Sequence, residues 1–387
     1  MPPRLVFVVT HGLTAATLMR GQLRFLAERG FEVHLLASPG PELDRAAAAE
    51  GVAMHPLPIQ REIAPLADLA SVARLTRALR HLRPDLVNSG TPKAGLLGSL
   101  AAAAARVPRR VYTLRGLRLE TARGSRRIVL AASERIAVRL AHRVVCVSES
   151  LRERAVQLRL VPEVKTRVLG AGSSNGVDAE RFRPAGADDA RGACLRRELG
   201  LAGGAEVIGF VGRLTHDKGI EDLLHAFGQV GERRPKARLL LVGDFEIGDP
   251  VAPDAIEAIR TDPHIVWTRM IADPAPYYQV MDVLAFPSYR EGFPNAPLEA
   301  AASGLPVVGY AATGTVDAIL DGRTGTLVTT GDTTALARAL EGYFERPERR
   351  REHGAAGRRR IEECFRRELI WQEWENLFRE LLAERRP

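Results

Sequence analysis

Residues 282–309 are Asp-Val-Leu-Ala-Phe-Pro-Ser-Tyr-Arg-Glu-Gly-Phe-Pro-Asn-Ala-Pro-Leu-Glu-Ala-Ala-Ala-Ser-Gly-Leu-Pro-Val-Val-Gly, and this segment is the most informative part of the chain. Its apolar run 283–286 predicts a buried strand, and a turn-rich loop with Glu291 leads into a short helix near Asn295. Glu299 lies one turn into that helix, and seven residues separate it from Glu291. Because open α/β sheets bind ligands outside the carboxyl ends of their strands, both carboxylates are expected at one ligand-binding edge.

Strand–helix alternation extends from this stretch in both directions. The sequence predicts strands at 5–10, 32–37, 86–87, 110–113, 143–147, 207–211, 238–242, 265–267, 306–310 and 325–328, with helices between them. Repeated β–α units with short connections predict parallel sheets with helices on both faces. The stretch from about 170 to 204 is predicted to be a linker. A charged helix over 366–386 carries an aromatic stripe, which predicts core packing at Trp371, Trp374 and Phe378.

The composition indicates a globular chain of two domains. It has 387 residues, of which 45% are hydrophobic and 26% charged. No apolar stretch reaches the roughly 18 residues of a spanning helix, and the opening is too short for a secretory signal. Three scattered cysteines favour a reducing, cytoplasmic compartment over a disulfide framework. No Cys/His spacing is typical of a zinc site.

A second motif, Phe-Val-Gly-Arg-Leu-Thr-His-Asp-Lys-Gly at 210–219, ends a predicted strand and opens a helix. The start of a helix favours an anion, and Arg213 and Lys218 add two cations there, which predicts a diphosphate cradle. A solvated loop with ordinary surface charges is the alternative. Neither half has a G-x-G-x-x-G after a strand or a P-loop, which disfavours a nicotinamide dehydrogenase or a P-loop phosphotransferase.

Carboxylates repel phosphate, so Glu291 and Glu299 are expected to bind hydroxyl groups. Charge-assisted bonds to hydroxyls contribute about 1.5–3 kcal/mol each. Two cations, two carboxylates and a helix N-terminus match one kind of ligand, a sugar attached to a nucleoside diphosphate. The alternative is that each glutamate makes a structural cap or ion pair.

These motifs resemble the retaining family-4 glycosyltransferases. The resemblance rests on Val-Gly-Arg-Leu-x-x-x-Lys-Gly from 211 and Glu-Gly-Phe-Pro-Asn-x-x-Leu-Glu-Ala-x-Ala-x-Gly-Leu-Pro-Val-Val from 291. It implies an α/β fold of the GT-B type, two Rossmann-like domains with parallel sheets facing a central cleft. The expected domains are an acceptor-binding domain at 1–183, a nucleotide-sugar-binding domain at 184–365, and a C-terminal helix at 366–387 that crosses back.

The resemblance also implies roles for single residues. Arg213 and Lys218 would hold the donor diphosphate, Glu299 the ribose, and Glu291 the donor sugar, with Arg213, Lys218 and Glu291 as the catalytic set. The backbone of the segment after Glu291 would assist at the sugar, and Met270 would lie near the base; that segment is Gly292, Phe293, Pro294 and Asn295. The implied activity is transfer of a hexosyl or N-acetylhexosaminyl group from a UDP-sugar, without a metal or other cofactor.

The N-terminal half resembles a narrower group, the bacterial family-4 enzymes of surface-polysaccharide assembly. The motifs are Thr-Pro-Lys-Ala-Gly-Leu-Leu-Gly from 91 and Tyr-Thr-Leu-Arg-Gly-Leu-Arg-Leu-Glu-Thr from 112. They imply a glycan or polyprenyl-diphosphate-linked acceptor near Gly12, Lys93 and Arg115. The family often has two glycines where only Gly12 stands, and a histidine where Arg115 stands. The acceptor-side role of that histidine is therefore left open between Arg115 and His11.

The net charge of +8 includes a cluster of arginines in the N-terminal half: Arg106, Arg109, Arg110, Arg115, Arg118, Arg123, Arg126 and Arg127. Such a cluster can attract an anionic membrane at about 1 kcal/mol per basic residue, or hold a diphosphate-linked acceptor. A solvated basic face is the alternative. Aromatic residues are 5% of the chain and do not interleave with these arginines, which disfavours nucleic acid.

Two alternative functions of the chain are also considered. A UDP-sugar 2-epimerase of the same architecture would act on the donor alone. A non-catalytic nucleotide-sugar-binding module would bind UDP without turnover.

Overall fold

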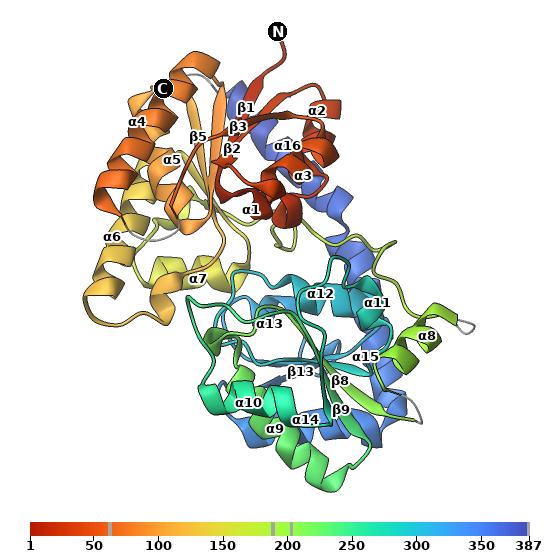
Figure 1. Ribbon diagram of the computed structural model, residues 1–387. Helices are drawn as coiled ribbons and strands as arrows, with labels where there is room; N and C mark the ends of the chain where they lie inside the picture. The colour runs from red at the N-terminus through yellow and green to blue at the C-terminus, as the bar shows by residue number, and fades with distance from the viewer. Residues whose placement is uncertain (61–63, 187–189, 202–203, 385–387) are drawn as a thin grey trace. The chain divides into compact units, whose positions relative to one another are not determined.

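The computed structural model describes residues 1–60, 64–186, 190–201 and 204–384. The chain forms two compact units, Met1–Asn175 with Arg367–Pro387, and Gly176–Arg366. Each unit is built on one parallel sheet covered by helices (Figure 1). The predicted α/β class with two parallel sheets is confirmed. The expected domain limits stay a prediction.

The first unit holds a seven-stranded sheet in the order β3-β2-β1-β4-β5-β6-β7, in which neighbouring strands run parallel. The strands are β1 (Arg4–His11), β2 (Glu32–Ser38), β3 (Ala53–Pro56), β4 (Leu86–Gly90), β5 (Arg109–Leu114), β6 (Arg143–Cys146) and β7 (Thr166–Arg167). The strand order reverses at β1 and β4. Their carboxyl ends therefore border the point where open α/β sheets bind ligands.

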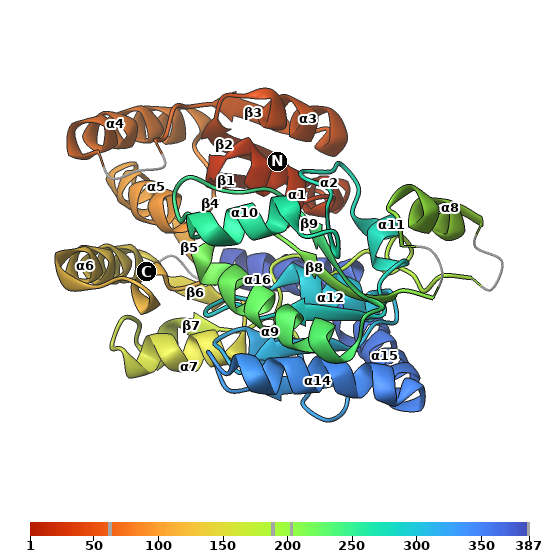
Figure 2. The ribbon, with the colours of Figure 1, turned by 60° about the horizontal axis from the view of Figure 1, so that its bottom comes forward.

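Helices cover both faces of this sheet. They are α1 (Gly12–Leu18), α2 (Gln22–Glu28), α3 (Pro41–Glu50), α4 (Pro65–Leu82), α5 (Pro92–Ala104), α6 (Gly124–Leu140), α7 (Glu149–Gln157) and α16 (Arg367–Ala383). Apolar residues of α1, α2, α3 and α16 share one core with one face of β1, while α4 and α5 pack on the other face. Helix α5 lies between α4 and α6 (Figure 2).

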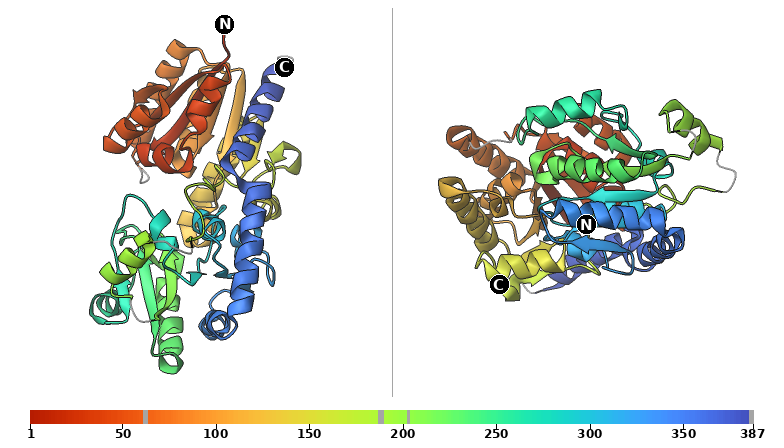
Figure 3. Two further views of the ribbon diagram at one scale, coloured as in Figure 1. Left: turned by 90° about the vertical axis from the view of Figure 1, so that its right-hand side faces the viewer. Right: turned by 90° about the horizontal axis from the view of Figure 1, so that it is seen from below.

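Helix α16 supplies a large part of the first core. Trp374 and Phe378 are buried, and the Phe378 ring lies edge-on to Phe7 of β1 with centroids 5.9 Å apart. The Trp371 indole nitrogen donates to Asn175 Oδ1 at 2.7 Å. The left view of Figure 3 shows this blue helix beside the sheet. The aromatic stripe is core packing, as its spacing predicts.

The second unit holds a six-stranded sheet in the order β10-β9-β8-β11-β12-β13. The strands are β8 (Glu206–Val211), β9 (Ala237–Val242), β10 (Ile265–Trp267), β11 (Val283–Phe286), β12 (Val307–Tyr310) and β13 (Gly325–Val328). The helices are α8 (Ala190–Glu198), α9 (Ile220–Arg233), α10 (Pro253–Thr261), α11 (Ala275–Tyr278), α12 (Asn295–Ala302), α13 (Thr315–Ala318), α14 (Thr333–Glu345) and α15 (Pro347–Arg360). Helices α9, α10 and α14 form one core with the sheet. The strand order reverses at β8 and β11, the strands that carry the two motifs.

Several elements were not predicted. Between the first two strands, where one helix near 18–29 was expected, the chain forms α1 and α2, separated by Gly21 with φ +82°; α2 lies within the expected range and α1 was not predicted. The expected linker contains α8, and α15 was missed because its arginine-rich sequence has no apolar period. The predicted tail helix ran to 386, and residues 385–387 lie outside the described residues. Within the described ranges, no helix is long and apolar enough to cross a bilayer.

Candidate active site

The loop after β8 lies against the loop after β11. Gly219 has φ +69°, and a Cβ added there would lie 2.1 Å from the carbonyl oxygen of Pro287. A side chain at this position would force the two loops apart. The glycine that closes the first motif is therefore required for contact with the second motif, and this contact brings Lys218 and Glu291 together.

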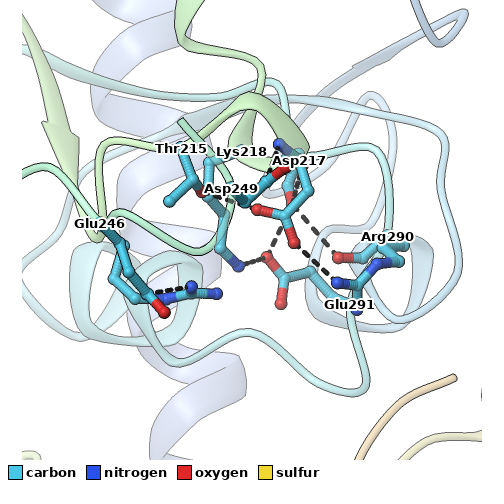
Figure 4. A network of polar contacts seen from close by, with 9 residues as sticks. Thr215, Asp217, Lys218, Glu246, Asp249, Arg290 and Glu291 are labelled. Carbon is cyan, nitrogen blue, oxygen red and sulfur yellow. Dashed lines mark hydrogen bonds and ion pairs between the residues drawn. The ribbon is translucent and has the colours of Figure 1, made fainter. Parts of the chain in front are cut away.

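Lys218 Nζ forms an ion pair with Glu291 Oε1 (Figure 4). Their side chains are 15% and 13% exposed, so the pair is largely shielded from water. Ser288 Oγ donates to the same carboxylate oxygen at 2.8 Å. The backbone N–H of Glu291 donates to the Thr313 carbonyl at 3.0 Å, which fixes the loop. A ligand phosphate at Lys218 must therefore share or replace the Glu291 carboxylate.

Asp217 anchors the loop between the two cations. Its carboxylate accepts from Thr215 Oγ1 at 2.6 Å and from Arg290 Nη2 at 2.8 Å, and its N–H donates to Asp249 Oδ2 at 2.8 Å. Burial alone would raise the pKa of Asp217. The hydrogen bond from Thr215 and the charges of Lys218 and Arg290 outweigh burial and lower that pKa below its ordinary value.

Asp217 and Arg290 were not predicted as site residues. Both lie inside the quoted motifs, and each precedes a predicted site residue of opposite charge, Lys218 and Glu291, which is the signal that could have found them. Their role is to hold the two loops in register, because Arg290 follows β11 and Asp217 follows β8.

Arg213 pairs with Glu246, which follows β9, and the Arg213 side chain is 44% exposed. Burial lowers the pKa of Arg213, but the bond to Glu246 and the charges of Asp217 and Glu291 raise it overall. Each predicted phosphate-binding cation thus has its own carboxylate partner. Glu246 was not predicted, because no local pattern links the loops after β8 and β9.

Glu299 has a different environment from Glu291. It lies on α12, and its Oε2 accepts from the hydroxyl of Tyr278 on α11 at 2.8 Å. Burial raises the pKa of Glu299, and the Tyr278 bond partly offsets this. Among the described residues, no cation lies within ion-pair distance of it. The two glutamates are therefore not equivalent: one is paired with a lysine and the other with a neutral hydroxyl.

The segment 292–295 leads into α12, whose first residue is Asn295. Phe293 is buried and packs on Phe365 with ring centroids 5.3 Å apart, so its side chain belongs to the core. Asn295 Oδ1 is buried and has no hydrogen-bond partner within the described part of the chain. A Cβ on Gly314 would lie 2.5 Å from the Gly292 carbonyl oxygen, so the β12 loop also touches this segment. Met270 follows β10 and is 71% exposed.

The N-terminal candidates gather at the carboxyl ends of β1, β4 and β5. A Cβ on Gly12 would lie 2.4 Å from the backbone nitrogen of Leu43, so the glycine is needed for packing on α3. Lys93, in the first turn of α5, pairs with Asp68 Oδ1 at 2.7 Å. Arg115 follows β5 and lies next to Gly90 at the end of β4. His11 ends β1 and is exposed.

The arginine cluster is not one surface. Arg109 is buried, and its Nε donates to the Leu381 carbonyl of α16 at 2.6 Å. Arg110 donates to the Leu140 carbonyl at 2.7 Å. The interpretation of the whole cluster as a binding face is wrong for these two residues. Arg123, Arg126 and Arg127 at the start of α6 are exposed.

Three loops with converging charges lie at the carboxyl edge of a parallel sheet, which is where open α/β proteins bind their ligands. Comparison of this sequence with known protein families identifies the family. Residues 15–181 match Glycosyltransferase Family 4, and residues 205–346 match the Glycosyl transferases group 1 family. The chain is 36% identical over 367 residues to the capsular polysaccharide biosynthesis glycosyltransferase CapM of Staphylococcus aureus, spanning 95% of this chain and 94% of that protein. The chain therefore belongs to the family-4 glycosyltransferases.

Other relatives agree with this assignment. An Escherichia coli UDP-Gal:alpha-D-GlcNAc-diphosphoundecaprenol alpha-1,3-galactosyltransferase is 29% identical over 251 residues, 64% of this chain and 63% of that protein. The crystal structure of Anabaena HepE in complex with UDP and glucose has a TM-score of 0.81 at 21% identity, covering 97% and 99% of the two chains. This likeness confirms the GT-B fold class. The comparisons give no support to the 2-epimerase alternative.

Proposed function

We propose that this chain is a retaining glycosyltransferase that moves a hexosyl or N-acetylhexosaminyl group from a UDP-sugar to an acceptor in cell-surface polysaccharide assembly. One observation carries the proposal: Lys218 and Glu291 meet at the carboxyl edge where α12 begins. The similarity to CapM over almost the whole chain supports it, as does the UDP in the HepE crystal structure.

The donor would lie along this edge. Arg213 and Lys218 bind its diphosphate, Glu299 binds the ribose hydroxyls, and Met270 lies near the base. Glu291 and the backbone of 292–295 bind the donor sugar. The assignments of Arg213, Lys218, Glu291 and Glu299 follow their charges, since cations attract phosphate oxygens and carboxylates accept from hydroxyls.

In the reaction, the bond between the anomeric carbon and the diphosphate oxygen breaks, and a bond to an acceptor hydroxyl oxygen forms on the same face. The acceptor proton passes to a donor phosphate oxygen. The protein's task is electrostatic, because charge grows on the departing UDP. Arg213 and Lys218 stabilise that charge without a metal, and losing one such group costs about 10²–10³ in rate.

The acceptor would be a glycan or a polyprenyl-diphosphate-linked glycan, a class that the name of the E. coli relative includes. We assign acceptor binding to residues 1–183, donor binding to 184–365, and the returning helix to 366–387. The chain would act in the cytoplasm, in peripheral contact with the inner face of the plasma membrane through the exposed arginines of α6.

Thermal shift with UDP and with a panel of UDP-sugars tests the donor site, because a ligand of the folded state raises stability by mass action. Incubation with donor and candidate acceptors then measures UDP release and product. Stabilisation by UDP without any turnover would favour the non-catalytic module. A UDP complex with the nucleotide away from Arg213, Lys218 and Glu299 would overturn the proposal.

A further inference from the structure

Arg115 carries a half-buried positive charge that the donor chemistry does not use. It follows β5, and its Nε would lie 3.2 Å from a Cβ placed on Gly90 at the end of β4. Both Nε and Nη1 are buried and have no hydrogen-bond partner among the described residues. Burial lowers the pKa of Arg115 to about 10, so the group is still protonated at neutral pH. A guanidinium with two buried, unpaired nitrogens is costly unless a ligand supplies the missing acceptors.

The groups next to Arg115 are those that bind oxyanions. Gly90 is followed by Thr91 and by α5, a helix of 13 residues. The Thr91 hydroxyl does not cap α5, and it lies 2.8 Å from the hydroxyl of Thr10, the next-to-last residue of β1. The start of α5 therefore retains the partial positive charge of a helix N-terminus.

The local charge balance favours an anion over a neutral sugar. Lys93 stands in the first turn of α5, and its ammonium is already balanced by Asp68. No carboxylate of the described residues bonds to Arg115. The charge left unbalanced is that of the Arg115 guanidinium, and the partial positive charge at the start of α5 adds to it. The planar fork of arginine matches the oxygens of a phosphate group.

We propose that Arg115 and the N-terminus of α5 bind the phosphate or diphosphate group of an anionic acceptor, so that the acceptor is a glycosyl phosphate ester and not a neutral glycan. This inference rests on the proposed function, and it names the part of the acceptor that the first unit recognises. It also assigns the open acceptor-side role to Arg115 instead of His11, because His11 is exposed.

The inference is tested by anion binding, without turnover. Inorganic phosphate, inorganic pyrophosphate and geranyl diphosphate are each titrated by calorimetry into the full chain saturated with UDP. Pyrophosphate affinity is expected to fall tenfold or more in Arg115→Gln, and to recover partly in Arg115→Lys, which restores the charge but not the fork. Arg77→Gln, which changes an exposed arginine of α4, is the matched control and should bind normally.

The three probes separate the sources of the anion. Tighter binding of geranyl diphosphate than of pyrophosphate indicates a lipid-linked diphosphate, and equal binding indicates that the phosphate group alone is recognised. Both results support the inference, provided that Arg115→Gln abolishes them. Pyrophosphate binding that is equal in wild type and Arg115→Gln would overturn it.

Thermal unfolding supplies a second readout. If Arg115 is a ligand-binding charge, Arg115→Gln removes a half-buried cation that lacks a carboxylate partner among the described residues, and the melting temperature without ligand should stay equal or rise. A clear fall would indicate a structural role and would count against the inference. The rise in melting temperature that UDP produces in the same variant distinguishes this outcome from a failure of the proposed function. If the proposed function is wrong, UDP will not stabilise the chain. Repeating the pyrophosphate titration in a Lys218→Ala background excludes anion binding at the donor site.

Discussion

Lys218 and Glu291 form a direct ion pair although 73 positions separate them in the chain. Without donor, the cation assigned to the diphosphate is neutralised by the carboxylate assigned to the sugar. Donor binding must therefore redistribute this pair: the phosphate takes a share of Lys218, and Glu291 gains sugar hydroxyls. Glu291 is therefore expected to oppose the binding of UDP, which has no sugar, and to favour the binding of the sugar in a UDP-sugar.

Glu291→Gln should bind UDP at least as tightly as wild type, and up to roughly fivefold more tightly, because an ion-pair competitor worth about 1 kcal/mol is removed. Transfer should nevertheless fall, since the sugar loses a charged acceptor. Calorimetry with UDP and a UDP-release assay measure the two effects. Glu257→Gln, an exposed glutamate on α10, is the control. Weaker UDP binding in Glu291→Gln would contradict the exchange.

Lys218→Ala should lower kcat about a hundredfold or more, because the growing charge on the departing diphosphate loses a preorganised cation. Arg213→Ala should act in the same direction. Steady-state kinetics measures the effect in variants whose melting temperature is normal. Lys236→Ala changes an exposed lysine that precedes β9, at the opposite end of the sheet, and should be fully active. Wild-type turnover in Lys218→Ala and Arg213→Ala would rule out the diphosphate role.

Glu299→Ala should mainly raise the donor KM, with a smaller effect on kcat. The ribose lies away from the bond that breaks, so its hydrogen bonds contribute equally to the bound donor and the transition state. Because Tyr278 donates to Glu299, Tyr278→Phe tests whether the tyrosine orients the carboxylate. An unchanged donor KM in Glu299→Ala would remove the assignment to ribose.

The stability of the first unit should depend on pH through Glu134. This carboxyl on α6 accepts from the Tyr112 hydroxyl at 2.7 Å, and burial raises its pKa from 4.5 to about 7. Between these values the unfolded chain releases a proton that the folded chain keeps, so stability falls as pH rises and levels off above about 7. The loss is on the order of 3 kcal/mol.

Glu134→Gln keeps an acceptor for Tyr112 and removes the charge. The difference in melting temperature between this variant and wild type should therefore grow from pH 5 to pH 8, in favour of the variant. Glu153→Gln, an exposed carboxylate on α7, serves as the control. A pH-independent difference would show that Glu134 does not titrate in this window.

Membrane contact should depend on the start of α6, where exposed Arg126 and Arg127 precede exposed Ile128. Binding to vesicles with anionic lipid should weaken with salt and fall in the double variant Arg126→Glu, Arg127→Glu. The same double reversal at Arg351 and Arg359 of α15 is the control, since both are exposed arginines on another helix. Equal binding to neutral vesicles, measured by sedimentation, would contradict an electrostatic contact.

Elements with a strong local signal were predicted well. Strand β11 is an uninterrupted apolar run, and α9 has an apolar face that includes Ile220, Leu223 and Phe227. Such patterns depend on neighbours within one or two turns, which the sequence displays directly. Strand β3 is short and only partly buried, and α15 is rich in arginine, so neither has a periodic signal.

The two parallel sheets, the two motif loops at strand ends and the charges in those loops can be inferred from the amino-acid sequence, because short-range periodicity and composition specify them. Which of these charges meet depends on the three-dimensional fold. It paired Lys218 with Glu291 and left Arg115 without a hydrogen-bond partner at Nε and Nη1 among the described residues. It also buried Arg109 under the carbonyls of α16, 272 positions away. The physical reason is that an ion pair depends on distance in space, and strand order and loop contact set that distance without leaving a local pattern.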